Sequence, residues 1–140
     1  MQIEIINQTD QVDTSLFKDI IDLVVEGEDH EGEFVNVIFM EQDELRALKN
    51  EYFGLDVYTD VIAFNLNDAS EGIEGEIYIS ITQINQNAKL YKTDTQTELY
   101  RVLIHGCLHL CGYEDNTDEL KRIMTSKEDL YLSNLKAFSR

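Results

Sequence analysis

Two histidines in the second half of the chain have the spacing of a metal site. They stand in the segment His105-Gly-Cys-Leu-His109. A helix turns by roughly 100° per residue, so side chains four positions apart lie on the same face. Zinc takes nitrogen, oxygen and sulfur donors in a tetrahedron, and two imidazoles supply half of it. Without a metal the same pattern describes two ordinary surface or core histidines, and spacing alone leaves both interpretations open.

A third ligand is expected shortly after this helix. Gly112 is a typical helix terminator and lets the chain fold back toward the histidines. The acidic side chains that follow are Glu114, Asp115 and Asp118. A carboxylate binds zinc at about the same distance as an imidazole, and three protein ligands leave one coordination position open for chemistry. The remaining histidine, His30, stands in an acidic segment and is expected to be solvated.

The two cysteines are expected to lie outside the metal site. Cys107 and Cys111 project from the side of the helix opposite to the histidines, so they cannot share a metal with them. Cysteine is often a small buried hydrophobe, and that is the role predicted for both. The N-terminal residues lack the basic and apolar regions of a signal peptide, so a disulfide framework is not expected.

Strands and helices must position the histidine helix. Alternating or β-branched segments predict strands, and apolar residues at helical spacing predict helices. The expected strands are 2–6, 34–40, 61–64 and 76–80, with a loop over 67–75. The expected helices begin near Asp13 or Thr14, Glu41, Ile84, Thr95 and Asn116. This order predicts a single α/β (α+β) domain over residues 1–140, with a mixed sheet of about four strands, about five helices and the metal site at a helix C-terminal end.

Local signals give the expected ends and faces of these helices. Thr95 and Glu98 form a capping-box pattern at the start of the histidine helix. The segment 50–58 is expected to be irregular, and Asn116 with Glu119 is expected to start the last helix. The apolar stripe expected on that helix comprises Leu120, Ile123, Met124, the Lys127 stem, Leu130 and Tyr131.

The charge balance restricts the partners. The chain has 140 residues, with 28 Asp plus Glu against 11 Lys plus Arg and a net charge of −17. Such a surface favours solubility and disfavours nonspecific contact with phosphate backbones or anionic membranes. No apolar run approaches the roughly 20 residues that span a bilayer. We therefore expect a cytoplasmic protein without membrane contact.

The segment from His105 to Tyr113 resembles the signature of the YbeY family of bacterial endoribonucleases, which reads His-Gly-x-Leu-His-Leu-x-Gly-Tyr-Asp-His. Every defined position from His105 to Tyr113 matches. Residues 59–64 resemble the family's Thr-Asp-Val-Leu-Ser-Phe, and residues 75–80 resemble its Gly-Asp-Ile-x-Ile-Ser. Glu98 and Leu99 fall where the family carries a Glu-Leu pair on the histidine helix. The resemblance runs from about Asn50 to the last helix.

The resemblance implies a metal-dependent hydrolase that cleaves single-stranded RNA. The family carries one zinc ion held by three histidines, and its members act in ribosomal RNA maturation and ribosome quality control. It further implies a ribosomal protein or a ribosome-assembly GTPase as a partner. By register Asp115 falls at the third histidine, so the ligand set implied here is His105, His109 and Asp115.

The chain departs from the family at further points. Phe53 stands where the family carries an arginine, which could stabilise the charge that develops on a phosphate. The net charge of −17 is unusual for an RNA-cleaving surface. Arg101, one helical turn before His105, is then the nearest positive candidate for a catalytic role by sequence.

Residues beside the ligands suggest the remaining chemistry. Glu114, next to the expected third ligand, is a candidate proton acceptor. Gly106 occupies the place of the glutamate in His-Glu-x-x-His, so peptide hydrolysis by that route is not expected. The alternatives are a hydrolase of a non-RNA substrate and a catalytically weak zinc-binding module associated with the ribosome. A basic rim around the site would favour RNA, and a uniformly acidic rim would favour the binding module or a cationic partner.

Overall fold

A computed structural model of the chain describes residues 1–68 and 71–138, with side chains as far as Leu135 in the last helix. Within these ranges lie four strands and five helices, which confirms the predicted α/β class. In chain order they are β1 (Gln2–Ile6), α1 (Phe17–Gly27), β2 (Gly32–Phe39), α2 (Gln42–Phe53), β3 (Val61–Asn65), β4 (Ile73–Ile79), α3 (Ile81–Tyr91), α4 (Thr95–Leu110) and α5 (Asp118–Phe138).

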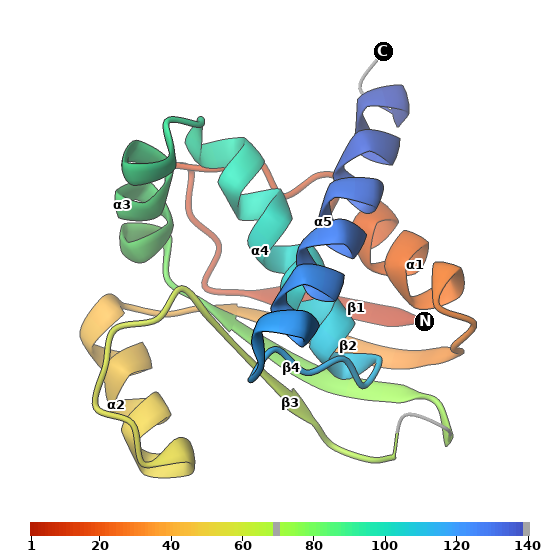
Figure 1. Ribbon diagram of the computed structural model, residues 1–140, viewed down its shortest axis with the longest axis horizontal. Helices are drawn as coiled ribbons and strands as arrows, with labels where there is room; N and C mark the ends of the chain where they lie inside the picture. The colour runs from red at the N-terminus through yellow and green to blue at the C-terminus, as the bar shows by residue number, and fades with distance from the viewer. Residues whose placement is uncertain (69–70, 139–140) are drawn as a thin grey trace.

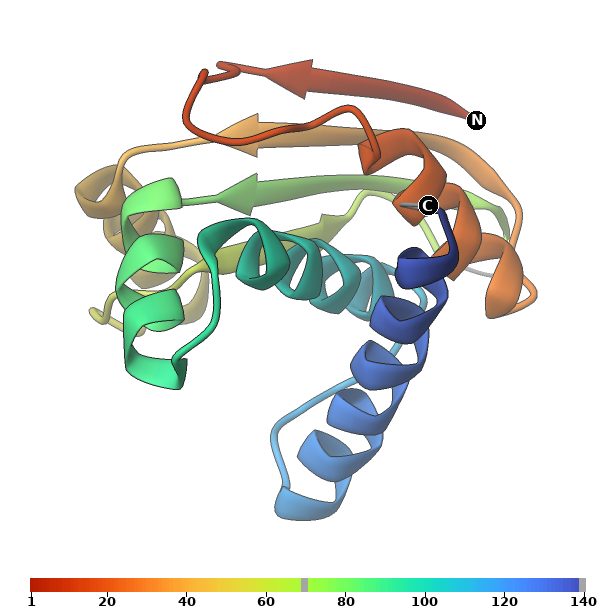
Figure 2. The same cartoon turned by 90° about the horizontal axis from the view of Figure 1, so that it is seen from above.

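The strands form one mixed sheet in the order β1-β2-β4-β3. The pairs β1–β2 and β2–β4 are parallel, and β3 runs antiparallel to β4. Helices α1, α4 and α5 gather on one side of the sheet, and α2 lies beside its β3 end (Figures 1 and 2). The histidine helix α4 contacts β3, β4, α1, α3 and α5, so it is the central helix of this layer.

Strand β4 shows why the sheet has one covered face. Its inward residues Ile73, Gly75, Ile77 and Ile79 are buried, whereas the three residues that alternate with them are partly exposed. This alternation is typical of a sheet with one face on the core. Two glycines let α4 approach closely, since a Cβ at Gly75 would lie 2.6 Å from Leu110 and a Cβ at Gly106 would lie 3.0 Å from Ile77.

Several predicted boundaries differ from the structure. Helix α1 begins at Phe17 with no side-chain cap, because the Asp13 carboxylate instead accepts a hydrogen bond from the Ser15 backbone. Asp94 is the N-cap of α4 and accepts from Thr97, so the Thr95–Glu98 capping box is wrong. Helix α2 continues to Phe53 through much of the segment expected to be irregular.

The loop predicted over 67–75 ends earlier than expected. Strand β4 begins at Ile73, where the Ile73 backbone N–H donates to the Glu31 carbonyl and extends the ladder with β2. Gly72, with φ of +106°, makes the turn into this strand. Residues 69–70 of the predicted loop lie outside the described residues.

The buried face of α5 differs from the predicted stripe. Ile123 and Leu130 are 41% and 51% exposed, whereas Met124, Glu128, Tyr131 and Leu135 are buried. These four positions follow the helical repeat, so a carboxylate takes a place on the core face. Over the described ranges, none of the helices combines the length and apolar character that a bilayer span requires.

Candidate metal centre

The two histidines of α4 direct one nitrogen each toward the same point. The Nε2 atoms of His105 and His109 lie 3.0 Å apart, and the two rings meet edge to face at 78°. Their side chains are 24% and 25% exposed, so the pair lies at the border between core and solvent. The predicted helical spacing therefore brings the imidazoles together.

The turn after α4 returns an acidic side chain to this pair. Gly112 has φ of +101°, and the Tyr113 backbone N–H donates to the carbonyl of Leu108. This left-handed turn places Asp115 Oδ2 3.2 Å from His105 Nε2 and 3.5 Å from His109 Nε2. One ligand atom from each of the three side chains lies within 4.8 Å of the others. Of the three acids considered from the sequence, the structure brings Asp115 to the histidines.

The hydrogen bonds of the two imidazoles test whether this group fits a metal ion. His105 Nδ1 lies 2.7 Å from Glu128 Oε2, and His109 Nδ1 lies 2.9 Å from the Tyr113 carbonyl oxygen. Both partners accept hydrogen bonds, which assigns the proton of each neutral ring to Nδ1. Two Nε2 lone pairs then face each other, and a cation between them removes their repulsion.

The donor separations also fit zinc. Donors at about 2.0 Å from a tetrahedral zinc ion are separated by about 3.3 Å. The three separations here are 3.0, 3.2 and 3.5 Å. Two imidazole nitrogens and a carboxylate oxygen form a donor set that zinc accepts, and a carboxylate–histidine contact of the Glu128 kind commonly orients such ligands.

Electrostatics differ between the two histidines. Burial works against the charged form of His105, but the hydrogen bond and charge of Glu128, together with Asp115 and Asp60, raise its pKa. Burial, followed by the charge of neighbouring His105, lowers the pKa of His109. In the absence of a metal, His105 therefore takes up the proton of the pair first.

The three side chains lie in an open cavity of about 590 Å³. The other residues that line it come from α2, from β3 with its preceding loop, and from the turn after α4, namely Lys49, Phe53, Thr59, Asp60, Val61, Ile62, Ala63, Asn65 and Glu114. The described lining thus has one lysine against Asp60, Glu114 and Asp115. Its charge is acidic on balance but not uniformly so, because Lys49 lies among the acids.

Comparisons with known proteins cover nearly the whole chain. The family model described as "Endoribonuclease YbeY" matches residues 2–136. The chain belongs to the endoribonuclease YbeY family. A protein of this name from Chlorobium phaeobacteroides is 38% identical over 136 residues, which is 96% of this chain and 98% of that protein. One from Chlorobaculum tepidum is 36% identical over 97% of this chain and 99% of its own length.

A solved structure confirms the fold of this YbeY family member. The solution structure of TM1509 from Thermotoga maritima has a TM-score of 0.65 and 31% identity, and the match covers 94% of this chain and 87% of that one. The family model and the similar endoribonucleases confirm the predicted family and the predicted enzyme class, a metal-dependent hydrolase.

Arg101 does not line the cavity that holds the three side chains. Its guanidinium donates from Nη1 to Glu128 Oε1 at 2.9 Å and from Nη2 to Asp129 Oδ1 at 2.7 Å. Glu128, which is 6% exposed, therefore joins Arg101 to His105 through its two carboxylate oxygens. The direct catalytic role predicted for Arg101 stays a prediction. The contacts of Arg101 indicate that it orients the Glu128 carboxylate.

A second buried carboxylate fixes the turn that carries Asp115. Glu28, at the end of α1, accepts hydrogen bonds from the hydroxyls of Tyr113 and Tyr131, and from Lys127 Nζ at 3.2 Å. Burial would raise the pKa of Glu28, but these three donors lower it. Because the Tyr113 carbonyl accepts from His109, this cluster links α1 and α5 to the orientation of a candidate ligand.

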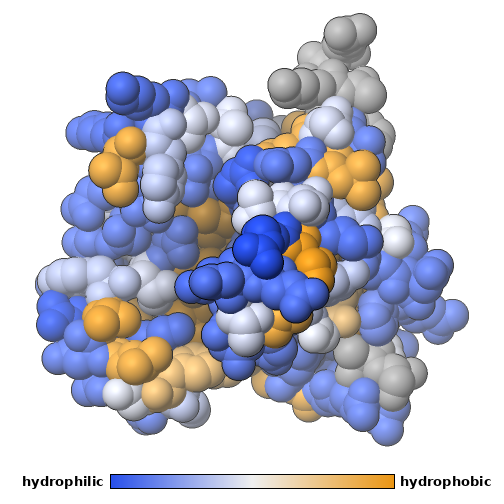
Figure 3. Space-filling model, viewed as in Figure 1, coloured by the Kyte–Doolittle hydropathy of each residue, from blue (hydrophilic) through white to orange (hydrophobic). Residues whose placement is uncertain are grey.

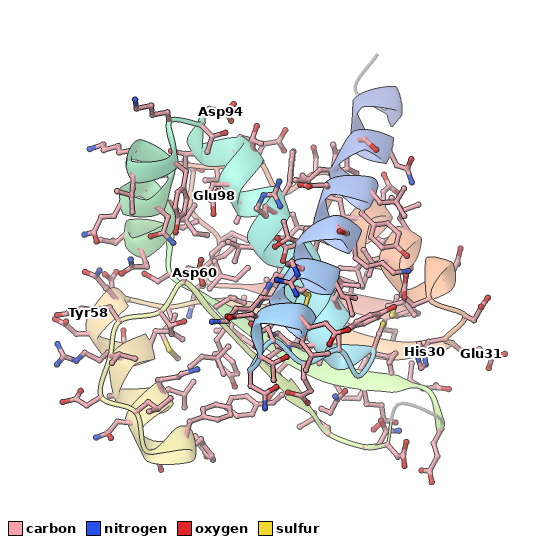
Figure 4. All side chains as sticks on the ribbon, in the orientation of Figure 1. His30, Glu31, Tyr58, Asp60, Asp94 and Glu98 are labelled. Carbon is pink, nitrogen blue, oxygen red and sulfur yellow. The ribbon has the colours of Figure 1, made fainter. Side chains whose placement is uncertain are left out.

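Two further acids, both labelled in Figure 4, differ in burial: Asp60 is partly buried and lines the cavity with the histidines, and Glu98 is buried on α4. Burial raises the pKa of Asp60, while His105 and the Asn87 side-chain amide, which donates to it at 3.0 Å, act in the opposite direction. Burial also raises the pKa of Glu98, and the charge of Asp60 adds to that effect. These two carboxyls therefore ionise less readily than exposed ones.

The cysteines and His30 take no part in this centre. Cys107 and Cys111 are buried and free, and burial raises the pKa of the Cys111 thiol to about 12. His30 lies in the turn before β2, on the opposite side of the molecule from Asp60 (Figure 4). The cysteines lie in the core, as the helical spacing predicted.

Sequence reasoning missed Glu128, Glu28 and Lys49. The available signal for Glu128 was its place between Met124 and Tyr131 at helical spacing, which puts an acid on an apolar face. Glu28 follows Gly27 in a run of polar residues, and nothing local separates it from a solvated acid. Lys49 required the knowledge that α2 continues to Phe53.

Proposed function

We propose that this protein is a zinc-dependent endoribonuclease that cleaves single-stranded RNA, with residues 1–140 acting as one metal-dependent hydrolase domain. The proposed metal ligands are His105, His109 and Asp115, which hold one zinc ion per chain. The observation that carries the proposal is the convergence of two imidazole lone pairs and one carboxylate oxygen in an open cavity. Membership of the YbeY family supplies the reaction class.

The residues around the ligands suggest how the reaction proceeds. Zinc, when bound, supplies Lewis-acid stabilisation of the charge that develops on phosphodiester oxygens. Glu128 and the Tyr113 carbonyl keep Nε2 of each histidine deprotonated and aimed at the ion. Glu114 lines the cavity next to Asp115 with an exposed carboxylate. It accepts the proton of the attacking hydroxyl, which belongs either to a water molecule or to the ribose next to the cleaved phosphodiester.

The substrate and partners follow from the family. We propose ribosomal RNA as the substrate, with roles in ribosomal RNA maturation and ribosome quality control, and therefore a cytoplasmic location. A ribosomal protein or a ribosome-assembly GTPase is the proposed protein partner. These assignments rest on the resemblance of the histidine segment and on the relatives called endoribonuclease YbeY.

Cleavage of a labelled single-stranded RNA at 0.15 M salt tests the proposal. Zinc-loaded wild-type protein should cleave the RNA, and His105→Ala and His109→Ala should lose both zinc and cleavage. Glu114→Gln should keep zinc but slow cleavage by about 100-fold or more, as expected for a lost general base. Glu119→Gln, an exposed acid on α5, is the matched control and should cleave normally. Intact RNA with zinc-loaded wild type would refute the proposal.

The acidic lining of the cavity favours a second candidate, a zinc-binding module with weak catalysis. Such a module would bind zinc with the same three residues and recognise a cationic partner instead of a phosphodiester. The same assay separates the two functions, because the module would show full zinc occupancy and no RNA cleavage. For such a module, His105→Ala would still weaken zinc binding, but the RNA would stay intact with wild type and variant alike.

A further inference from the structure

Aromatic side chains gather beside the metal centre, where the last turn of α2 meets the final residues of β3. Phe53 stacks on Phe64, with ring centroids 5.9 Å apart and an interplanar angle of 15°. Tyr52 meets Phe64 edge to face at 5.2 Å, and Tyr78 does so from the neighbouring strand at 5.8 Å. Phe53 and Tyr52 nevertheless remain 48% and 62% exposed. Hydrophobic residues are visible on this part of the surface, at the lower left of Figure 3.

Phe53 belongs to the same cavity as the three candidate ligands. The cavity that contains His105, His109 and Asp115 is also lined by Phe53 and Lys49. The Lys49 ammonium lies 4.7 Å from the centre of the Phe53 ring. Lys49 is the one lysine or arginine in the described lining of the cavity. A flat aromatic surface and a positive charge therefore stand side by side within reach of the reacting centre.

The overall charge restricts what can bind there. A protein with a net charge of −17 gains little from long-range attraction to a phosphate backbone. The face of a nucleobase is uncharged, and its stacking on an aromatic side chain contributes substantially to single-strand binding without regard to sequence. A protein partner would need a wide surface, whereas Phe53 lies in a concave site that also contains the candidate ligands.

We propose that Phe53, supported by Phe64, is a subsite for one unpaired nucleobase of the RNA, and that Lys49 contacts the adjoining phosphate. This inference rests on the proposed function and specifies how its substrate is held. The base displaces the Lys49 ammonium from the ring, and the ammonium then pairs with the phosphate beside that base. At the position where the family carries an arginine, Phe53 would thereby contribute to RNA binding by stacking on a base.

The absence of tryptophan from the chain allows a direct test. Phe53→Trp introduces a single indole at the subsite, and Tyr91→Trp introduces one at a position on α3 that is 65% exposed and lines no part of this cavity. Each zinc-loaded variant is titrated with a 2′-O-methyl hexaadenosine, whose integrity is checked afterwards. Stacking predicts quenching of the indole in Phe53→Trp and none in Tyr91→Trp. Equal responses, or none in either variant, would overturn the subsite.

Affinity measurements then assign the two roles. Phe53→Ala should weaken binding of the hexanucleotide about 5- to 100-fold, to a similar degree at low and high salt. Lys49→Ala should weaken it in a way that fades as salt rises, because a phosphate contact is screened. If wild type cleaves RNA and Phe53→Ala binds it equally well, the subsite is refuted and the proposed function stands. If zinc-loaded wild type neither binds nor cleaves RNA, both are refuted.

Discussion

Each imidazole of the metal centre has its Nδ1 occupied by the protein itself. Glu128 holds His105 and the Tyr113 carbonyl holds His109, so both Nε2 atoms are presented to the same point. Arg101 in turn holds the second oxygen of Glu128. The chain therefore has contacts of the kind that orient metal ligands in addition to the proposed ligands.

Removal of Glu128 should weaken zinc binding without removing a ligand. Glu128→Ala frees His105 to rotate and to change tautomer, and we expect a 10- to 100-fold loss of zinc affinity, the usual effect of losing such a contact. Competition with a chromophoric chelator measures this. Glu128→Gln still offers an oxygen to His105 Nδ1 and should recover part of the affinity, whereas Asp129→Ala should change it least. Unchanged affinity in Glu128→Ala would show that the contact is dispensable.

Helix α4 combines the functional histidines with a face that is wholly part of the core. Leu99, Leu103, Cys107 and Leu110 are buried along it, whereas Glu98, two turns before His105, is buried at 5% exposure on the histidine side of the helix. Burial raises the pKa of Glu98 above its ordinary value of 4.5. A carboxyl with a raised pKa stabilises the fold fully below its unfolded-state pKa and loses that contribution as the pH rises through the folded-state pKa.

Glu98→Gln should therefore stabilise the protein in a pH-dependent way. Once the pH exceeds the folded-state pKa, the wild-type carboxylate is ionised and buried, so the neutral amide should then raise Tm by about 3 °C, corresponding to ~1 kcal/mol. The gain should shrink as the pH falls below the ordinary value of 4.5, where the wild-type carboxyl becomes protonated in both states. Thermal unfolding at several pH values measures this, with the exposed Glu51→Gln as control. A gain that is the same at every pH would rule out ionisation as its cause.

The sequence predicted the elements of the fold better than the contacts between them. The strands, the histidine helix and the return of the chain after Gly112 all follow from local patterns, which adjacent residues determine. The placement of Glu28 beside Tyr113 depends on α1, α4 and α5 packing together, and no local pattern encodes it. Helix α2 was underestimated because its last turn, which includes Tyr52 and Phe53, is aromatic and has little helical propensity of its own.

In the candidate site, too, the sequence predicted residues from local patterns but not the contacts between elements. Spacing predicted His105 and His109, and family register selected Asp115 from the three acids that followed Gly112. The sequence did not predict the surroundings of the ligands, because Glu128 comes from another helix, Lys49 from α2 and Asp60 from the segment before β3. Residues that contact across elements require the tertiary structure.

On the scale of the whole molecule, the net charge of −17 sets the field that an RNA strand meets. That field extends about 30 Å at 0.01 M salt and about 8 Å at 0.15 M salt. Added salt screens the repulsion of the strand while leaving base stacking and metal contacts largely intact. The dependence of RNA cleavage on salt should therefore differ from that of a nuclease with a basic groove.

We expect kcat/KM for a single-stranded RNA to rise a few-fold between 0.01 and 0.15 M salt. A basic binding groove would instead lose affinity steeply over this range. Initial rates at several salt concentrations, with zinc held constant, measure the effect. A control with a short uncharged-backbone substrate analogue as competitor should show binding that hardly depends on salt. A tenfold fall in kcat/KM with salt would contradict the account.

The third ligand carries the central claim, since it distinguishes this centre from one with three histidines. Zinc content and affinity should be measured for wild type, Asp115→Ala and Glu114→Ala under the same conditions. We expect one zinc per chain in wild type and in Glu114→Ala, and a loss of zinc affinity of about tenfold or more in Asp115→Ala. Full zinc affinity in Asp115→Ala together with its loss in Glu114→Ala would contradict the assignment.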